Sequence, residues 1–199
     1  MGATTGSATA DEIRRTALEL FSTAGYSTTT MREISAAVGI RAASLYNHFA
    51  AKEEILWDLT RTALDELDQR RQEGQNALPD GAGPVDRLRA FVDSHTRFHA
   101  THQREAALIN RQLRGLSPAH YRRAVAMRDA YAAHLRTVIS DGVAAGVMAV
   151  PDVKVTSFAL LEMGMGLATW YRPNGPIGVA DLSRMHQELA VKLTAPVRG

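Results

Sequence analysis

The sequence predicts an all-α protein, and three observations support that class. Apolar residues recur every three to four positions along almost all of the 199 residues, which is the period of a helix buried on one side. No stretch shows the strict alternation, bounded by turns, that is typical of a β-strand. The periodic segments are separated by residues that begin or end helices, such as Gly39, Ser117 and Pro118. We therefore expect about nine helices.

Four helices are expected in the first third of the chain. Residues 1–8 carry neither a basic nor an apolar block, so we expect a flexible tail there. Thr9 and Glu12 have the spacing of a capping box that opens the first helix, and Thr30 and Glu33 repeat that spacing before the second. The four helices are expected over residues 9–24, 30–38, 42–49 and 52–72.

Five further helices are expected after a loop rich in Gly and Pro at residues 74–84. The longest opens with Ser117 as N-cap and Pro118 in its first turn. The apolar run at residues 158–171 contains Glu162 and is too short to span a membrane, so it predicts a buried helix instead. The five helices are expected over residues 85–102, 105–114, 117–145, 152–171 and 180–194.

The composition excludes several classes of function. The chain is 45% hydrophobic and 22% charged with a net charge of +2, as in an ordinary globular protein. It has no Cys, which excludes disulfides and thiolate metal ligands and favours a reducing cytoplasm. No pairing of nucleophile and base and no phosphate-binding loop is present, so we assign no catalytic residue, no metal and no cofactor.

The short segment AVGIRAASLYNHF (residues 37–49) points to a binding function. Helical spacing puts Leu45 and Phe49 on one side, where they can dock onto the two preceding helices, and leaves small and polar residues on the other. A helix this short is marginal alone, so its neighbours must hold it. Two short helices around a tight turn at Gly39 form a helix-turn-helix, whose second helix can enter the DNA major groove.

Residues 10–60 also resemble the TetR family of bacterial transcriptional regulators, across TTTMREISAAVGIRAASLYNHFAAKEEIL. Arg41 departs from the small hydroxyl residue that commonly caps the recognition helix in that family, a loss worth about 0.5–2 kcal/mol, and Arg41 is expected to reach a phosphate instead. The resemblance implies a double-stranded DNA operator. The residues expected to contact phosphates are Thr30, Tyr46, His48 and Lys52, and those expected to face bases are Ala43, Ser44 and Asn47.

A homodimer is expected, because specific binding needs two such motifs spaced one helical turn apart, about 34–36 Å. Residues 158–171, within the helix expected at 152–171, are apolar nearly all round, and their small residues leave room for close helix packing. We expect it to form a four-helix bundle with residues 180–194 and their symmetry mates, which also resembles the family. The expected interface residues are Leu160, Gly164, Leu167, Ala168, Leu182, Met185, Leu189 and Leu193.

The helices expected over residues 85–145 should enclose a small hydrophobic ligand. The segment WYRPNGP (residues 170–176) resembles that of TetR-type regulators of fatty-acid or steroid catabolism, which makes an acyl-CoA one candidate, although Arg172 at a helix end is equally favoured by the helix dipole. The expected lining residues are Phe91, His95, Phe98, Leu108, Ile109, Gln112, Val125, Tyr131, Leu135, Phe158 and Leu161.

The favoured hypothesis is a cytoplasmic, non-enzymatic repressor without a membrane partner, which a ligand releases from a palindromic operator. Its domains would be a tail at 1–8, a DNA-binding domain at 9–55 and a ligand-binding and dimerisation domain at 56–199. Two alternatives stay open. One is a helical enzyme or metal-binding protein that uses His95, His99 and His102, which share one helix face. The other is a helix-turn-helix adaptor that binds protein instead of DNA.

Overall fold

The protein is all-helical, as predicted. The computed structural model describes residues 3–196, with side chains from residue 8 onward. Within those residues it contains ten α-helices, one 3₁₀ helix and no strand. The elements are α1 (Ala3–Thr23), α2 (Met31–Val38), α3 (Ala42–Tyr46), α4 (Lys52–Asn76), α5 (Pro84–Thr101), α6 (Gln103–Arg111), η1 (Leu113–Gly115), α7 (Pro118–Ala144), α8 (Val153–Met165), α9 (Leu167–Trp170) and α10 (Val179–Thr194).

Two expected boundaries were wrong. The tail expected over residues 1–8 is helical from residue 3, so Thr9 lies inside α1 instead of capping it, and residues 1–2 lie outside the described part. No proline interrupts this stretch, and a helix that is already nucleated can extend through residues of modest helix propensity such as Thr and Ser. The helix expected over residues 152–171 is divided at Gly166 into α8 and α9, and glycine lowers the stability of a helix interior.

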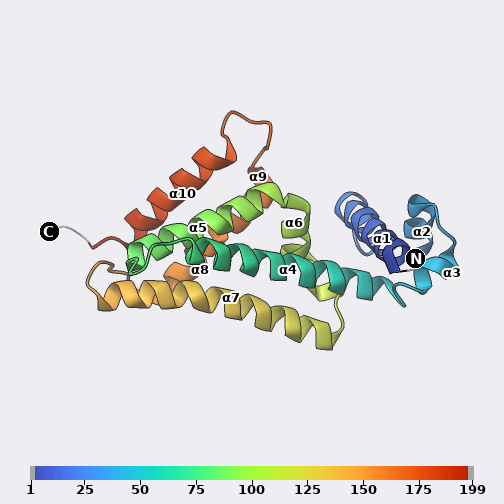
Figure 1. Ribbon diagram of the computed structural model, residues 1–199, viewed down its shortest axis with the longest axis horizontal. Coiled ribbons are helices and arrows are strands. Elements are labelled where there is room, and N and C mark those ends of the chain that lie inside the picture. Colours follow the sequence, from blue (N-terminus) through green and yellow to red (C-terminus); the bar gives the residue numbers. More distant parts are fainter. Residues whose placement is uncertain (1–2, 197–199) are drawn as a thin grey trace.

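The helices α1, α2 and α3 form a cluster at one end of the molecule (Figure 1). Helix α4 extends away from that cluster through the remaining helices, and α5 and α7 pack beside it. Helix α8 packs on α5 and α7, while α10 packs mainly on α5. The expected domain boundary between residues 55 and 56 therefore falls inside α4, and the division itself stays a prediction.

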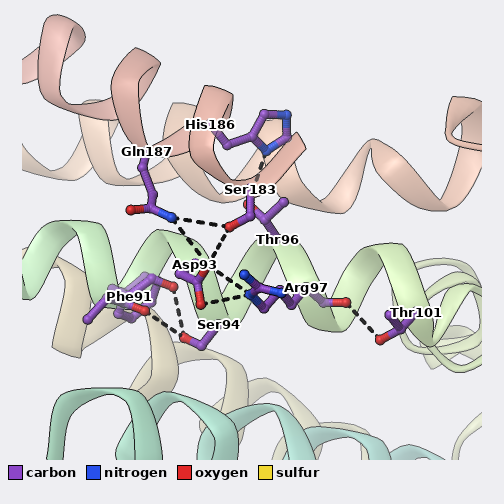
Figure 2. A network of polar contacts seen from close by, with 10 residues as sticks. Phe91, Asp93, Ser94, Thr96, Arg97, Thr101, Ser183, His186 and Gln187 are labelled. Atoms are coloured by element: carbon purple, nitrogen blue, oxygen red, sulfur yellow. Dashed lines mark hydrogen bonds and ion pairs between the residues drawn. The ribbon is translucent and has the colours of Figure 1, made fainter. Parts of the chain in front are cut away.

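A polar network fixes α10 on α5 (Figure 2). Asp93 Oδ1 accepts hydrogen bonds from Ser183 Oγ at 2.6 Å and from Gln187 Nε2 at 3.2 Å. One turn along, Thr96 Oγ1 lies 3.1 Å from His186 Nδ1. Because Ser183, Thr96 and His186 are all buried, this contact determines which face of α10 points outward.

Among the described helices, none is long and apolar enough to cross a membrane.

Candidate DNA-binding surface and ligand cavity

The turn between α2 and α3 is fixed by its local sequence. The expected capping box at Thr30 is present, since its hydroxyl accepts from the Glu33 N–H at 3.2 Å and Glu33 Oε2 accepts from the Thr30 N–H at 2.7 Å. Helix α2 ends at Gly39, whose φ of 77° is a left-handed conformation that glycine adopts without strain. The chain therefore enters α3 at a defined angle.

Helix α3 is held by the core on one side only. Leu45 is fully buried and Phe49 nearly so, in one apolar cluster with Phe21 and Ile34, as predicted. The helix is even shorter than expected, and no side chain caps it at Arg41. Its stability must therefore come from this docking and not from its own hydrogen bonds.

The opposite face of α3 is free within the chain. Tyr46 is 52% exposed, so its ring and hydroxyl are available to a partner. The other expected DNA-binding residues on this side are exposed or half-buried, and their contacts with DNA stay a prediction. Exposed are Thr30, Arg41, Ala43 and Asn47; half-buried are Ser44 and His48.

Lys52 has surroundings that the sequence did not indicate. Its ammonium donates to the carbonyl oxygens of Tyr26 and Thr29, each at 2.6 Å, and lies 4.4 Å from the centre of the Tyr26 ring. A lysine has three donors, and the Ser27 carbonyl at 3.4 Å takes the third. Lys52 therefore holds the loop between α1 and α2, and a phosphate contact would have to replace some of these bonds.

A second contact joins the start of α4 to the start of α7. Glu53 Oε1 accepts from the Ser117 N–H at 2.7 Å and from His120 Nδ1 at 2.9 Å. Burial raises the pKa of Glu53, but these hydrogen bonds outweigh it, and the net pKa lies below the usual value. Trp57 stacks on the His120 ring with centroids 4.6 Å apart. We name this set, Glu53, Trp57, Ser117 and His120, the α4–α7 contact.

Several residues expected at a dimer interface are instead buried within one chain. A Cβ on Gly164 would lie 2.3 Å from His95 Cδ2, so this glycine makes room for a histidine of its own chain, not for a partner helix. Ala168 lines a groove of about 330 Å³ between α1 and α6. Three more residues that were expected at the interface are buried in the chain's own core, which corrects that expectation; they are Leu160, Leu167 and Leu182.

The remaining interface residues are exposed, as a dimer would require. Met185, Leu189 and Leu193 on α10 are 45–57% exposed. Val155 and Phe158 on α8, which contacts α10, are 65% and 46% exposed. Phe158 was also expected to line the ligand site from behind, and it lines an open groove on the outer side of α7 and α8.

A small cavity lies among α4, α5, α6, α7 and α8. Its volume is about 50 Å³. Four of the expected ligand-binding residues line it, namely His95, Ile109, Tyr131 and Leu161. The other lining residues are Leu64, Leu67, His99, Asn110, Arg128 and Met165. We name it the inner cavity.

The other expected ligand-binding residues lie elsewhere. Val125 and Phe158 line an open groove of about 290 Å³ on the outer side of α7 and α8, which we name the outer groove. Leu108 and Gln112 line the groove between α1 and α6. Phe91, Phe98 and Leu135 are core residues that line neither the inner cavity nor these two grooves, because helical period alone does not separate core from pocket.

His95 and Tyr131 are structural. His95 Nε2 lies 3.0 Å from the Leu161 carbonyl, which can only accept, so Nε2 carries the proton and Nδ1 accepts from the Tyr131 hydroxyl at 3.1 Å. Burial lowers the pKa of His95 to about 4 and raises that of Tyr131 far above its usual value. Both are therefore neutral near pH 7, and they tie α5 to α7 and α8.

The side chains of His95, His99 and His102 do not converge. His95 is fully bonded, His99 faces the inner cavity, and His102 Nε2 lies 3.2 Å from Glu66 while its ring stacks on Phe98. In the part of the chain that the structure describes, no group of three His, Cys, Asp or Glu side chains could hold a metal ion. The metal-binding alternative therefore gains no support.

Arg128 in the inner cavity was missed by the sequence analysis, although a signal for it exists. It occupies the helical stripe that Ala124, Tyr131 and Leu135 define, and those three side chains are buried. A charged residue at a core position of an amphipathic helix indicates a functional or specifically paired group.

Comparisons with known proteins agree with this architecture. Residues 13–59 match the family model of bacterial regulatory proteins of the tetR family, and residues 81–194 match the model of the tetracyclin repressor-like C-terminal domain. The HTH-type transcriptional repressor KstR2 of Mycolicibacterium smegmatis is 27% identical, over 92% of this chain and 88% of its own. A tetR-family regulatory protein from Rhodococcus RHA1 has a similar fold, with 24% identity, 96% and 98% coverage and a TM-score of 0.88. AibR, solved with isovaleryl coenzyme A and operator DNA, is 25% identical with 94% and 98% coverage and a TM-score of 0.79.

Proposed function

We propose, since this chain belongs to the TetR family of bacterial regulatory proteins, that it is a transcriptional repressor that binds a palindromic operator as a homodimer and leaves it when a small hydrophobic ligand binds. The observation that carries the proposal is α3, which the core holds on one face while Tyr46, Asn47 and Arg41 stay exposed on the other. The relatives named as repressors support it.

The exposed face of α3 has the chemistry of a recognition helix. Asn47 can bond an adenine through two hydrogen bonds, while Arg41, Thr30 and Tyr46 can donate to phosphates and set the register. These residues belong to a DNA-binding domain at 9–55, and residues 56–199 form the domain for ligand and dimer. The protein acts in the cytoplasm and needs no catalytic residue.

A second copy of the chain covers the exposed apolar residues of α8 and α10. Five large apolar side chains on two contacting helices exceed what a monomer commonly leaves in water. The network between Asp93 and Ser183 fixes α10 with these side chains outward, so the surface is preformed. The interface therefore consists of Val155, Phe158, Met185, Leu189 and Leu193.

The α4–α7 contact supports a route from ligand to DNA. A ligand that enters among α5, α7 and α8 displaces α7, and Glu53 passes that shift to the start of α4 through Ser117 and His120. Gly115 adds to the contact, because a Cβ there would lie 2.7 Å from Tyr26 in the loop before α2. Ligand thus favours a state in which the two α3 helices are wrongly spaced for successive major grooves.

The ligand of this chain is apolar in most of its length, given the lining of the outer groove. An acyl-CoA is one candidate class. AibR was solved with an acyl-CoA, and Arg172 is exposed after α9, where it could meet an anionic headgroup.

Selection from a pool of genomic DNA fragments, followed by fluorescence anisotropy at two salt concentrations, tests the proposal. We expect enrichment of palindromic fragments and binding that weakens as salt rises, because phosphate contacts release counterions. Tyr46→Phe should weaken binding to all fragments alike, by roughly threefold to tenfold for one lost phosphate hydrogen bond. The matched control, Tyr121→Phe on α7, should bind as the wild type does. Failure to enrich any fragment, or equal binding to all of them, would overturn the proposal and favour a protein-binding adaptor.

A further inference from the structure

His99 on α5 is a buried polar side chain without a partner. It is 1% exposed, and neither of its ring nitrogens has a hydrogen-bond partner among the described residues. Nearly all buried polar groups in proteins are paired, so an unpaired imidazole indicates a missing partner. Burial, then the neighbouring His95 and Arg128, lower the pKa of His99, so its ring is neutral and offers one N–H donor and one acceptor.

Arg128 on α7 lines the same cavity as His99. Its guanidinium makes only long contacts, at 3.4 Å to the Ile109 carbonyl and 3.9 Å to the sulfur of Met165. Among the ion pairs of the described residues, none includes Arg128. A half-buried cation with free donors attracts an anion.

The inner cavity and the outer groove are neighbours separated by three side chains, since Arg128, Leu161 and Met165 line both. Arg128 and Met165 are long and flexible, so they can move aside without a change in the backbone. The inner cavity, at about 50 Å³, admits one group of a few atoms, whereas the outer groove, at about 290 Å³, has room for an apolar body. The two together fit a molecule with one small polar end.

The chemistry of the inner cavity selects a carboxylate as that end. A carboxylate can accept two hydrogen bonds from Arg128 and a further one from His99, which gives Arg128 a counter-charge and His99 a partner. A hydroxyl or ketone would leave Arg128 without a counter-charge, and an ammonium would be repelled by it. Asp129 and Glu162 also line the outer groove, where they repel an anion, whereas Arg128, which lines both spaces, attracts it.

We propose that the effector is an apolar carboxylic acid whose carboxylate enters the inner cavity between His99 and Arg128 while its hydrocarbon body lies in the outer groove. This inference rests on the proposed function, in that it names the chemical class of the ligand. It distinguishes a free acid from the thioester of a simple fatty acid, which has no carboxylate to offer.

Isothermal titration calorimetry on the full chain tests the proposal with hexanoate, octanoate and decanoate as probes, beside methyl octanoate, 1-octanol and octanoyl-CoA. We expect at least one carboxylate to bind about tenfold or more tightly than its uncharged analogues, which corresponds to one charge-assisted hydrogen bond. Arg128→Met and His99→Phe should each remove that advantage. Arg122→Met, at an exposed position on the same helix, should leave it unchanged.

Two results would overturn the proposal. One is that no carboxylate binds, or that methyl octanoate or octanoyl-CoA binds as tightly as octanoate. The other is unchanged binding of octanoate in a folded Arg128→Met variant, with Arg128→Gln, which also removes the charge, used in its place if circular dichroism shows that the first does not fold. Because calorimetry needs no DNA, either result leaves the operator-binding experiment unaffected, so failure of this inference is distinct from failure of the proposed function.

Discussion

Replacement of Gly164 by alanine should destabilise the protein through a collision inside a single chain. The added Cβ would lie 2.3 Å from His95 Cδ2 and 2.6 Å from Nε2, distances at which something must move. The imidazole cannot turn away freely, because hydrogen bonds to Tyr131 and the Leu161 carbonyl hold both of its nitrogens. The substitution therefore tests the packing of α8 on α5.

The magnitude follows from three effects. Overpacking of a core costs about 1–3 kcal/mol, and two strained or lost hydrogen bonds cost about 1 kcal/mol each. Alanine in a helix returns about 1 kcal/mol relative to glycine. The net loss is about 2–4 kcal/mol, which lowers the melting temperature of a chain of this size by roughly 5–15 °C.

Differential scanning calorimetry at a fixed protein concentration measures the effect. Gly74→Ala is the matched control, because Gly74 also lies inside a helix and its would-be Cβ meets no heavy atom closer than 3.5 Å. In a His95→Ala background, Gly164→Ala should cost little, because the colliding ring is absent. A Gly164→Ala variant that melts like the wild type but sediments as a monomer would refute this reasoning and return Gly164 to the dimer interface.

Two further predictions concern the dimer and the pH dependence that His95 gives to stability. Leu189→Glu should convert the dimer to a folded monomer in sedimentation velocity, because it places a charge in the proposed interface. The control Thr137→Glu, at an exposed position on α7, should leave the dimer intact. A dimer that survives Leu189→Glu would exclude this face of α10 from the interface. The free energy of unfolding should fall as the pH drops from about 6.5 to about 4, because the folded-state pKa of His95 is about 4 and the unfolded chain binds a proton first. His95→Phe should make that slope shallower in denaturant titrations, and an unchanged slope would show that His95 is not the group responsible.

Local chemistry explains what the sequence could predict. The capping box at Thr30, the left-handed Gly39 and the anchor Leu45 act within about fifteen residues of one another, so their pattern is complete in the sequence. The all-α class followed in the same way, from periodicity that each helix carries by itself.

Contacts across the chain explain what it could not. Helical periodicity predicted that Leu160, Leu167 and Leu182 are buried, but it could not show whether a partner chain or the chain's own core buries them. Gly164 and His95 meet only after α5 and α8 have packed, and the carbonyl contacts of Lys52 depend on a loop more than twenty residues away. These are tertiary choices, which override local preference.

Because helix α4 is long and continuous, a small tilt of the helix produces a large displacement at its end. Its 25 residues form one continuous helix of about 37 Å, which begins six residues after α3 ends and lines the inner cavity with Leu64 and Leu67 at its middle. If α4 pivots about its C-terminal end, a tilt of only about 5° displaces its N-terminal end by roughly 3 Å, which is close to the 3.4 Å rise of one base pair. A two-fold axis doubles the relative displacement of the two tips. Under the proposed function, a ligand that moves the interior by less than the width of an atom would put both recognition helices out of register with DNA.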